Sequence, residues 1–326
     1  MTTLSAEAYL QGIRDQNRVI LSQAITLIES TREDHQKLAR DVVSLCLPFS
    51  NLSFRMGITG APGVGKSTFI DALGIHLVES GKHVAVLAID PSSQKTSGSI
   101  LGDKTRMARL SRHPKAFIRP SPNSGTLGGI ASRTREAMIL CEAAGFDIIF
   151  VETVGVGQSE FSVHQLVDIL LLLVITGAGD DLQGIKRGIM EMADLIIINK
   201  ADGENTQPAR QLKRLLRQAT HVLPSPRKNW ETRVVEASSI NGAGIDDIAT
   251  STDEFEALMR TSGDLTLNRG QQALAWMRRH IEEGLHRLLV NDAEVSDQLS
   301  VLEEEVLQGK TNPITAADAV LKMLER

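Results

Sequence analysis

The stretch FRMGITGAPGVGKST, residues 54–68, decides the fold. Its second half matches the pattern G-x-x-x-x-G-K-[ST] at 60–67, after a short apolar run and before a helical stretch at 67–80. In this order, strand, glycine-rich turn and helix place main-chain N–H groups and the positive end of a helix around a phosphate. The stretch therefore predicts a nucleotide-binding P-loop on an α/β sheet.

Most residues of this loop have an expected role. Lys66 places a positive charge against the β- and γ-phosphates, which makes it a candidate catalytic group. The hydroxyl of Ser67 can coordinate magnesium. The glycines allow the main chain to turn toward the phosphates. The predicted phosphate-binding residues are Gly60, Ala61, Pro62, Gly63, Val64, Gly65, Lys66, Ser67 and Thr68.

Outside the loop, short apolar runs alternate with longer amphipathic stretches. The runs span 54–59, 84–90, 147–153, 168–175, 194–200 and 233–237. This alternation indicates helical crossovers on a mostly parallel sheet. Thr59, Asp90 and Glu152 end three of the runs, and open α/β sheets bind ligands beyond the carboxyl ends of their strands. The expected fold class is α/β, a P-loop NTPase with helical extensions at both ends.

The two ends of the chain have helical apolar spacing instead. Residues 1–50 form one such segment, closed by Pro48, and 51–262 hold the predicted nucleotide domain. Beyond about residue 263, an apolar stripe precedes a helix at 293–308, an interruption at Pro313 and a helix at 316–325. The stripe comprises Leu274, Met277, Ile281, Leu285 and Leu288. The segment 263–326 is either a helical cap or a dimerisation arm, and its length favours the arm and a homodimer.

The tetrapeptide NKAD at 199–202 follows an apolar run and indicates guanine rather than adenine. The carboxylate of Asp202 can accept both N1–H and the exocyclic amine of guanine, a donor pair that adenine lacks. A site built around such groups rejects analogues without them by up to ~10⁴-fold. Lys200 can lie along the base, and Asn199 can tie this loop to the phosphate loop. After the run 233–237, Ser238, Ser239 and Ile240 are the expected second base-contacting loop.

Magnesium takes oxygen ligands and usually keeps several waters. Glu152 ends an apolar run and opens Glu-Thr-Val-Gly155, where the D-x-x-G switch of small GTPases would stand. It is a candidate metal ligand, with a helix-capping carboxylate as the alternative. Gly155 would bring a main-chain N–H to the γ-phosphate. Asp90 or Asp103, at either end of a polar loop, could hold the metal or its waters, and position favours Asp90.

Two further loops are open to more than one interpretation. Gln158 is a candidate for orienting the attacking water, and a solvated loop residue is an equal alternative. The loop GAGDDLQGIKRG at 177–188 has four glycines after a buried strand, which costs stability. We interpret it as a movable element near the nucleotide or a partner, with a plain connection as the alternative. Arginines at 106, 109, 133 and 135 are interpreted as surface or ion-pair residues.

The composition excludes other classes of protein. A formal charge of −5 and a pI near 5.9 argue against a general nucleic-acid binder. The start of the chain lacks a secretory pattern, and the longest apolar run, 169–175, is far shorter than the ~20 residues that span a bilayer. Cys46 and Cys141 have no metal-ligand spacing and are expected to be reduced thiols. We therefore expect a cytoplasmic protein.

Several longer strings resemble the MeaB/ArgK family, bacterial GTPases associated with methylmalonyl-CoA mutase, within the signal-recognition and metallochaperone (SIMIBI) branch of P-loop proteins. The resemblance covers nearly the whole chain and is densest from 56 to 202. It is most specific in ILGDKTRM and ETVGVGQSE. The full set is GITGAPGVGKST, DPSSQKTSGSILGDKTRMARL, FIRPSPNSGTLGG, CEAAGFDIIFVETVGVGQSE, GAGDDLQGIKRG and NKAD.

The resemblance implies a magnesium-dependent GTPase that loads, protects or reactivates an adenosylcobalamin-dependent mutase, with GTP hydrolysis stimulated by that partner. It also implies a homodimer built through the C-terminal arm. At matching positions, Lys66, Ser67, Asp90, Asp103 and Glu152 would act on phosphate and magnesium. Lys186 would correspond to the lysine that partner binding brings into the active site. Cobalamin itself is expected in the mutase.

Three other functions are alternatives. A nickel metallochaperone GTPase would normally need clustered His or Cys, and the eight histidines here are scattered. A P-loop kinase linked to transport proteins is a second alternative, against which NKAD favours GTP. A non-catalytic nucleotide-sensing scaffold is the third, and the intact Lys66, Ser67 and Glu152 argue against it.

Overall fold

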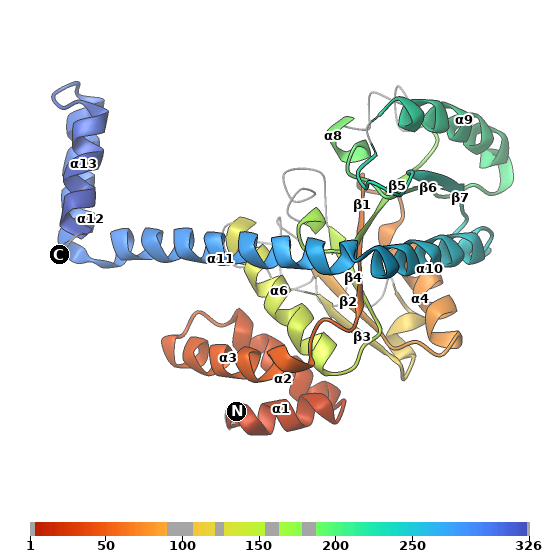
Figure 1. Cartoon of the computed structure of the whole chain (residues 1–326), viewed down its shortest axis with the longest axis horizontal. Helices are drawn as coiled ribbons and strands as arrows, with labels where there is room; N and C mark the ends of the chain where they lie inside the picture. Colours follow the sequence, from red (N-terminus) through yellow and green to blue (C-terminus); the bar gives the residue numbers. More distant parts are fainter. Residues whose placement is uncertain are drawn as a thin grey trace. The chain divides into compact units, whose positions relative to one another are not determined.

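The computed structural model describes residues 4–89, 107–120, 127–153, 163–177, 187–223 and 225–324. Within them, seven strands form one parallel sheet in the order β3-β2-β4-β1-β5-β6-β7 (Figure 1). The prediction of an α/β fold with a mostly parallel sheet is confirmed. The strands are β1 (Phe54–Gly60), β2 (Val84–Ile89), β3 (Ala116–Pro120), β4 (Ile148–Thr153), β5 (Ile169–Val174), β6 (Leu195–Ile198) and β7 (Arg233–Glu236).

Alternate residues of the central strands enter apolar cores on opposite faces of the sheet, because successive side chains of a strand point to opposite faces. On one face, α4 (Lys66–Glu79) and α10 (Ile245–Ser262) pack with Phe54, Met56 and Ile58 of β1. On the other, α8 (Arg187–Met190) and α9 (Thr206–Val222) pack with Leu172 and Val174 of β5 and with Ile196 and Ile198 of β6. Burial on both faces explains why these strands are continuous apolar runs in the sequence.

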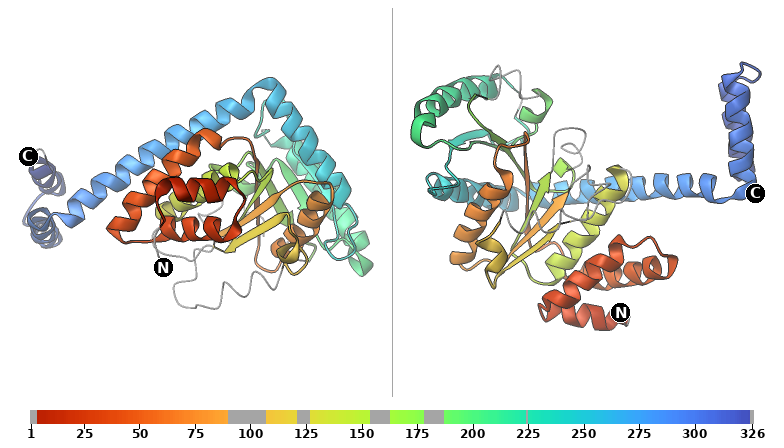
Figure 2. Two further views of the ribbon diagram at one scale, coloured as in Figure 1. Left: turned by 90° about the horizontal axis from the view of Figure 1, so that it is seen from below. Right: turned by 180° about the vertical axis from the view of Figure 1, so that it is seen from behind.

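Three N-terminal helices pack on one another and on α6 (Leu127–Ala143), as both views of Figure 2 show. They are α1 (Ala6–Arg14), α2 (Arg18–Glu29) and α3 (Glu33–Cys46), followed by the short helix η1 (Leu47–Phe49). An ion pair of 2.6 Å joins Glu29 of α2 to Arg119 of β3. The helices are thereby fixed beside the β3 edge of the sheet.

The two cysteines are both free and buried. Burial raises the pKa of the Cys46 thiol to about 11 and raises the pKa of Cys141 as well. Both therefore stay protonated at neutral pH, and neither is a reactive thiolate.

Residues from Gly270 onward form a second compact unit, separate from the first unit, which ends at Arg269. Helix α11 (Asp264–Asn291) begins in the first unit and continues into the second, which also contains α12 (Ala293–Leu307) and α13 (Pro313–Leu324). Val295, Leu302, Ala316 and Val320 form a small core there. The start expected for the last helix, residue 316, was wrong. Pro313 opens this helix, because the first helical position needs no N–H donor.

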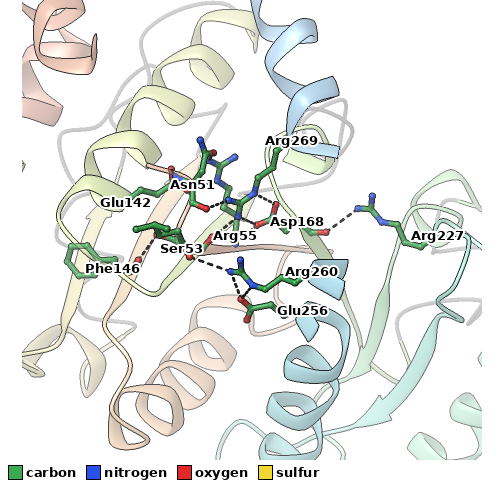
Figure 3. Close-up of polar contacts among 11 residues, drawn as sticks. Asn51, Ser53, Arg55, Glu142, Phe146, Asp168, Arg227, Glu256, Arg260 and Arg269 are labelled. Atoms are coloured by element: carbon green, nitrogen blue, oxygen red, sulfur yellow. Dashed lines mark hydrogen bonds and ion pairs between the residues drawn. The ribbon is translucent and has the colours of Figure 1, made fainter. Parts of the chain in front are cut away.

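At the amino ends of the strands, charged side chains are buried against one another (Figure 3). Asp168, just before β5, accepts hydrogen bonds from the main-chain N–H of Arg55 at 2.9 Å and from the guanidinium of Arg269 at 2.6 and 2.9 Å. Arg55 pairs with Glu142 of α6 at 2.7 Å. Arg269 also donates to the carbonyl of Asn51. These contacts fix the beginning of α11 to the starts of β1 and β5.

Two more aspartates stand directly before a strand and bind a neighbouring main chain. Asp147, before β4, accepts the N–H of His83 at 2.7 Å. Asp194, before β6, accepts the N–H of Leu170 at 2.8 Å and the Nε of Arg227 at 3.2 Å. Together with Asp168, these carboxylates lie at the amino edge of the sheet, where each accepts a hydrogen bond from a main-chain N–H of the same chain. We refer to this set of contacts as the amino-edge network.

Strand β3 was not expected from the sequence. Its five residues, AFIRP, include Arg119 and Pro120, and a short polar strand of this kind is tolerated at a sheet edge. Short 3₁₀ turns at Leu110–Arg112 (η2) and Gly203–Asn205 (η3) complete the described elements. Among the helices that the structure describes, none combines the length and apolar character needed to cross a membrane.

Candidate functional site

The phosphate loop connects the carboxyl end of β1, at the centre of the sheet, to α4. Gly60 has φ +150°, and a Cβ there would collide with the carbonyl oxygen of Leu173 in β5. Gly65 has φ +94° and directly precedes α4, so its left-handed conformation favours glycine. The Nζ of Lys66 donates to the carbonyl of Gly60 at 2.7 Å. The lysine ammonium thus lies against the loop where the P-loop pattern expects phosphate.

A hydroxyl and a carboxylate meet beside this loop. The Oγ of Ser67 donates to Oε1 of Glu152 at 2.9 Å, and Glu152 is only 3% exposed at the end of β4. The next residue of β4, Thr153, donates its hydroxyl to the Oγ1 of Thr59 in β1 at 3.2 Å. Both atoms of the first pair are oxygens, the ligand type that magnesium prefers. The pair therefore fits the two metal-ligating residues expected on β4 and α4.

The described ranges contain no other gathering of metal ligands, since no three His, Cys, Asp or Glu side chains there come together. Magnesium needs few protein ligands because it keeps several of its waters. Of the four residues expected to hold magnesium, Ser67 and Glu152 are the two that the structure describes.

The loop after β6 is fastened to the phosphate loop. Asn199, 2% exposed, donates from Nδ2 to the carbonyl of Val64 at 2.9 Å. The Nζ of Lys200 donates to the carbonyl of Gly63 at 2.9 Å, and Lys200 itself has φ +58°. The contact between Asn199 and the phosphate loop, expected from the NKAD motif, is present. A nucleotide that spans both loops would therefore meet one connected unit.

The loop after β7 positions the side chains of the NKAD segment. The Oγ of Ser238 donates to Oδ2 of Asp202 at 2.9 Å, and the Oγ of Ser239 donates to Oδ1 of Asn199 at 2.8 Å. Both serines are buried, whereas Ile240 is 79% exposed. Because Ser238 binds one carboxylate oxygen of Asp202, the orientation of this carboxylate is restricted.

Five of the site residues expected from the sequence lie outside the described residues: Asp90, Asp103, Gly155, Gln158 and Lys186. The structure therefore brings together the phosphate loop, Ser67 with Glu152, and the two base loops. All of these lie at the carboxyl edge of the sheet, which is where an open α/β sheet binds ligands.

Asp71, in the second turn of α4, was not expected from the sequence to have a role. Its two carboxylate oxygens accept the Nε of Arg109 and the N–H of Leu110, both at 2.8 Å. The interpretation of Arg109 as an ion-pair residue is confirmed. The signal for Asp71 was its place as the only acidic residue in the apolar stretch FIDALGIHL, residues 69–77. The contact fastens the segment after residue 106 to the helix that carries the phosphate loop.

A family model described as "Methylmalonyl Co-A mutase-associated GTPase MeaB" matches residues 21–294. This match includes the phosphate loop, the Ser67–Glu152 pair and both base loops. The chain belongs to the MeaB family. As a MeaB-family protein it is a P-loop GTPase, and the prediction of that enzyme class from the sequence is confirmed.

Individual relatives agree with this assignment. GTPase ArgK of Escherichia coli (strain K12) is 47% identical over 284 residues, which cover 87% of this chain and 86% of ArgK. The mitochondrial methylmalonic aciduria type A homolog of Mus musculus is 43% identical over 321 residues, which cover 95% of this chain and 77% of the mouse protein. A crystal structure titled LAO/AO transport system kinase has a TM-score of 0.78, 35% identity and coverage of 98% of both chains.

Proposed function

We propose that this MeaB-family GTPase is a G-protein chaperone of an adenosylcobalamin-dependent acyl-CoA mutase, with methylmalonyl-CoA mutase as the expected partner. Its task would be to load, protect or reactivate the mutase cofactor, with cobalamin held in the mutase. The observation that carries the proposal is the hydrogen bond by which Asn199 joins the expected base loop to the phosphate loop, in a chain matched by a family described as mutase-associated. The mouse relative is also named for methylmalonic aciduria.

The phosphate half of the pocket supplies positive charge and metal ligands. Lys66 would turn from the loop carbonyls to the β- and γ-phosphates, while Ser67 and Glu152 would hold magnesium, helped by Asp90 and Asp103. Magnesium bound there would neutralise charge that develops between the two phosphates.

The remaining expected groups complete the phosphate half. The N–H of Gly155 would contact the γ-phosphate, and Gln158 would orient the attacking water. With the loop 60–68 around the phosphates, these groups would support magnesium-dependent hydrolysis of GTP to GDP.

The purine half of the pocket selects the base. Asp202, oriented by Ser238, would accept the two guanine donors, and Lys200 would lie along the base plane. Ser239 acts through Asn199, whose amide it fixes, and the exposed Ile240 would cover the base.

A catalytic cation supplied through partner binding explains why a mutase would stimulate hydrolysis. We propose Lys186 for that role, since a positive charge placed against the transition state is worth ~10³–10⁵ in rate in related nucleotide hydrolysis. The test is the ratio of GTP hydrolysis rates with and without methylmalonyl-CoA mutase. Lys186→Ala should bring this ratio close to one, and Lys82→Ala, which removes an exposed lysine just after α4, should keep the parental ratio.

Two outcomes of this experiment count against separate parts of the proposal. If the mutase leaves the parent protein's rate unchanged, the chaperone function is refuted. If the mutase stimulates parent and Lys186→Ala equally, the function stands and the role of Lys186 is refuted.

The expected homodimer and compartment belong to the same proposal. Leu274, Met277, Ile281 and Leu285 recur at helical spacing along α11, and each is 52–53% exposed. A continuous apolar stripe of this kind supports pairing with a second copy. Two buried free thiols support a reducing compartment, for which the cytoplasm is our expectation.

A kinase function is the second candidate, because the solved relative is titled a transport system kinase. The same phosphate loop could deliver the γ-phosphoryl group to a protein hydroxyl instead of water. Incubation with γ-labelled GTP and the mutase separates the two functions, since a kinase leaves label on protein and a GTPase releases it as phosphate.

A further inference from the structure

Two buried threonines join the ends of β1 and β4 beside the phosphate loop. Thr59 is the last residue before Gly60, and Thr153 directly follows Glu152. Both threonines are fully buried. The Oγ1 of Thr153 lies 3.2 Å from the Oγ1 of Thr59 and 3.3 Å from the carbonyl oxygen of Ile58. We call Thr59 and Thr153 the threonine pair.

The threonine pair lies just beyond the point where the main-chain pairing of these two neighbouring strands ends (Figure 1). The register of β1 with β4 ends at Ile58 and Glu152, whereas β1 stays paired with β5 as far as Gly60. The last contact between β1 and β4 is therefore made by side chains. Thr153 makes this contact, because its hydroxyl reaches both the carbonyl of Ile58 and the hydroxyl of Thr59.

The two strand ends that the threonine pair joins lead to the expected magnesium ligands. Thr59 precedes the loop that carries Ser67, and Thr153 follows Glu152, whose Oε1 accepts the hydroxyl of Ser67 at 2.9 Å. Magnesium demands near-ideal octahedral geometry, with ligand oxygens at about 2.0–2.1 Å. A small change in the spacing of the two strand ends would therefore change the affinity for the metal.

A role in packing alone is the alternative for these threonines. Threonine is favoured in strands, and a buried hydroxyl needs a hydrogen-bond partner wherever it lies. Thr252 is an example, since it is 1% exposed and donates to the carbonyl of Ala249 in its own helix, α10, at 2.8 Å. The threonine pair differs because its hydrogen bond joins two strands, across 94 residues of sequence, at the edge that carries the nucleotide motifs.

From this placement, we propose that Thr153 acts through Thr59 as a positioning residue, which sets Glu152 against the phosphate loop for magnesium binding. The side chains of Thr153 and Glu152 point to opposite faces of the sheet, because successive side chains of a strand alternate. Thr153 therefore acts on the metal through the position of β4 and does not coordinate it. The inference rests on the proposed magnesium site of Ser67 and Glu152.

The test is metal binding by the full-length protein with GDP bound. Manganese suits the same oxygen ligands as magnesium, and the free ion is measured by electron paramagnetic resonance. Thr153→Val removes the hydroxyl and keeps the branched shape. It should raise the dissociation constant of manganese by about threefold to tenfold, the range of one lost hydrogen bond. Thr153→Ser keeps the hydroxyl and should stay within about twofold of the parent.

Thr252→Val is the matched control, because it removes an equally buried hydroxyl whose hydrogen bond lies within α10. It should leave manganese binding unchanged. Thr59→Val should weaken binding as Thr153→Val does. The double variant should bind no more weakly than Thr153→Val alone, because both substitutions remove the same contact. Thermal unfolding in metal-free buffer shows that each variant is folded.

Three results would overturn the proposal. They are equal manganese affinity of the parent and Thr153→Val, an equal loss of affinity in Thr252→Val, and additive losses in the double variant. A parent protein that binds no manganese with GDP would refute the magnesium site together with this inference. Manganese binding by the parent that neither threonine affects would refute this inference alone.

Discussion

The two edges of the central sheet use polar side chains in opposite ways. At the amino edge, Asp168 and Asp194 are buried, and they are bound by arginines and by main-chain N–H groups of the same chain. At the carboxyl edge, Asn199 and Lys200 hold the loops to each other, while Asp202 binds Ser238 through one carboxylate oxygen, Oδ2. The charges of one edge therefore stabilise the fold, whereas the other edge prepares groups for a ligand.

The largest effect that follows from this contrast is on nucleotide choice. Asp202→Asn should weaken GTP binding and favour xanthine nucleotides, with a change in preference of up to ~10⁴-fold, because the carboxylate proposed to accept the guanine donors is lost. Calorimetric titration with GTP and XTP measures it. Glu204→Gln removes the same charge from an exposed position two residues away and should leave the preference unaltered. Unchanged GTP affinity in Asp202→Asn would contradict the base-reading role.

The amino edge should respond in stability rather than in ligand choice. Asp168→Asn leaves the buried guanidinium of Arg269 without its carboxylate, and breaking a buried pair in this way costs about 3–5 kcal/mol. The midpoint of urea unfolding should fall accordingly. Asp34→Asn, in an exposed pair with Arg32, should not move it. Equal midpoints for parent and Asp168→Asn would show that the amino-edge network is dispensable.

A smaller effect is expected from pH at the same edge. The pKa of His164 is lowered to about 4 from its ordinary value near 6.5, mainly by burial and to a smaller extent by the positive charge of Arg227. As pH falls, His164 is therefore protonated in the unfolded chain before it is protonated in the folded protein. The free energy of unfolding decreases as a result between about pH 6.5 and 4. His164→Gln should reduce this loss by about 1–3 kcal/mol, since one pKa unit corresponds to ~1.4 kcal/mol.

The comparison of His164→Gln with the parent is needed because another group has the opposite sign. Burial raises the pKa of Asp194 to about 6, so Asp194 adds stability as pH falls through 6. This contribution is present in both proteins and cancels in their difference. Parallel stability curves for parent and variant between pH 7 and 4 would contradict the burial of a neutral His164.

The carboxyl edge was easier to predict than the amino edge for a physical reason. The phosphate loop and NKAD are short local patterns that follow apolar runs, so Ser67, Glu152 and Asn199 could be placed at one edge of the sheet from these patterns alone. The amino-edge network gave a partial signal, because the runs at 147, 168 and 194 each begin with Asp. Their partners could not be found, since Arg269 lies 101 residues from Asp168.

Other misses came from weak local patterns. β3 is short and carries Arg119 and Pro120, so tertiary pairing with β2 rather than apolar periodicity makes it a strand. Pro313 was interpreted as an interruption, although the same residue is also favoured at a helix start.

Gly65 links the two nucleotide motifs in a way that limits how they can change. A Cβ at this position would lie 2.8 Å from the Nδ2 of Asn199, the atom that holds the base loop to Val64. Any larger residue would push that amide away. A substitution in the phosphate motif would therefore also reduce the discrimination between purine bases. A substitution in either motif would thus disturb the other, and the two loops act mechanically as one unit.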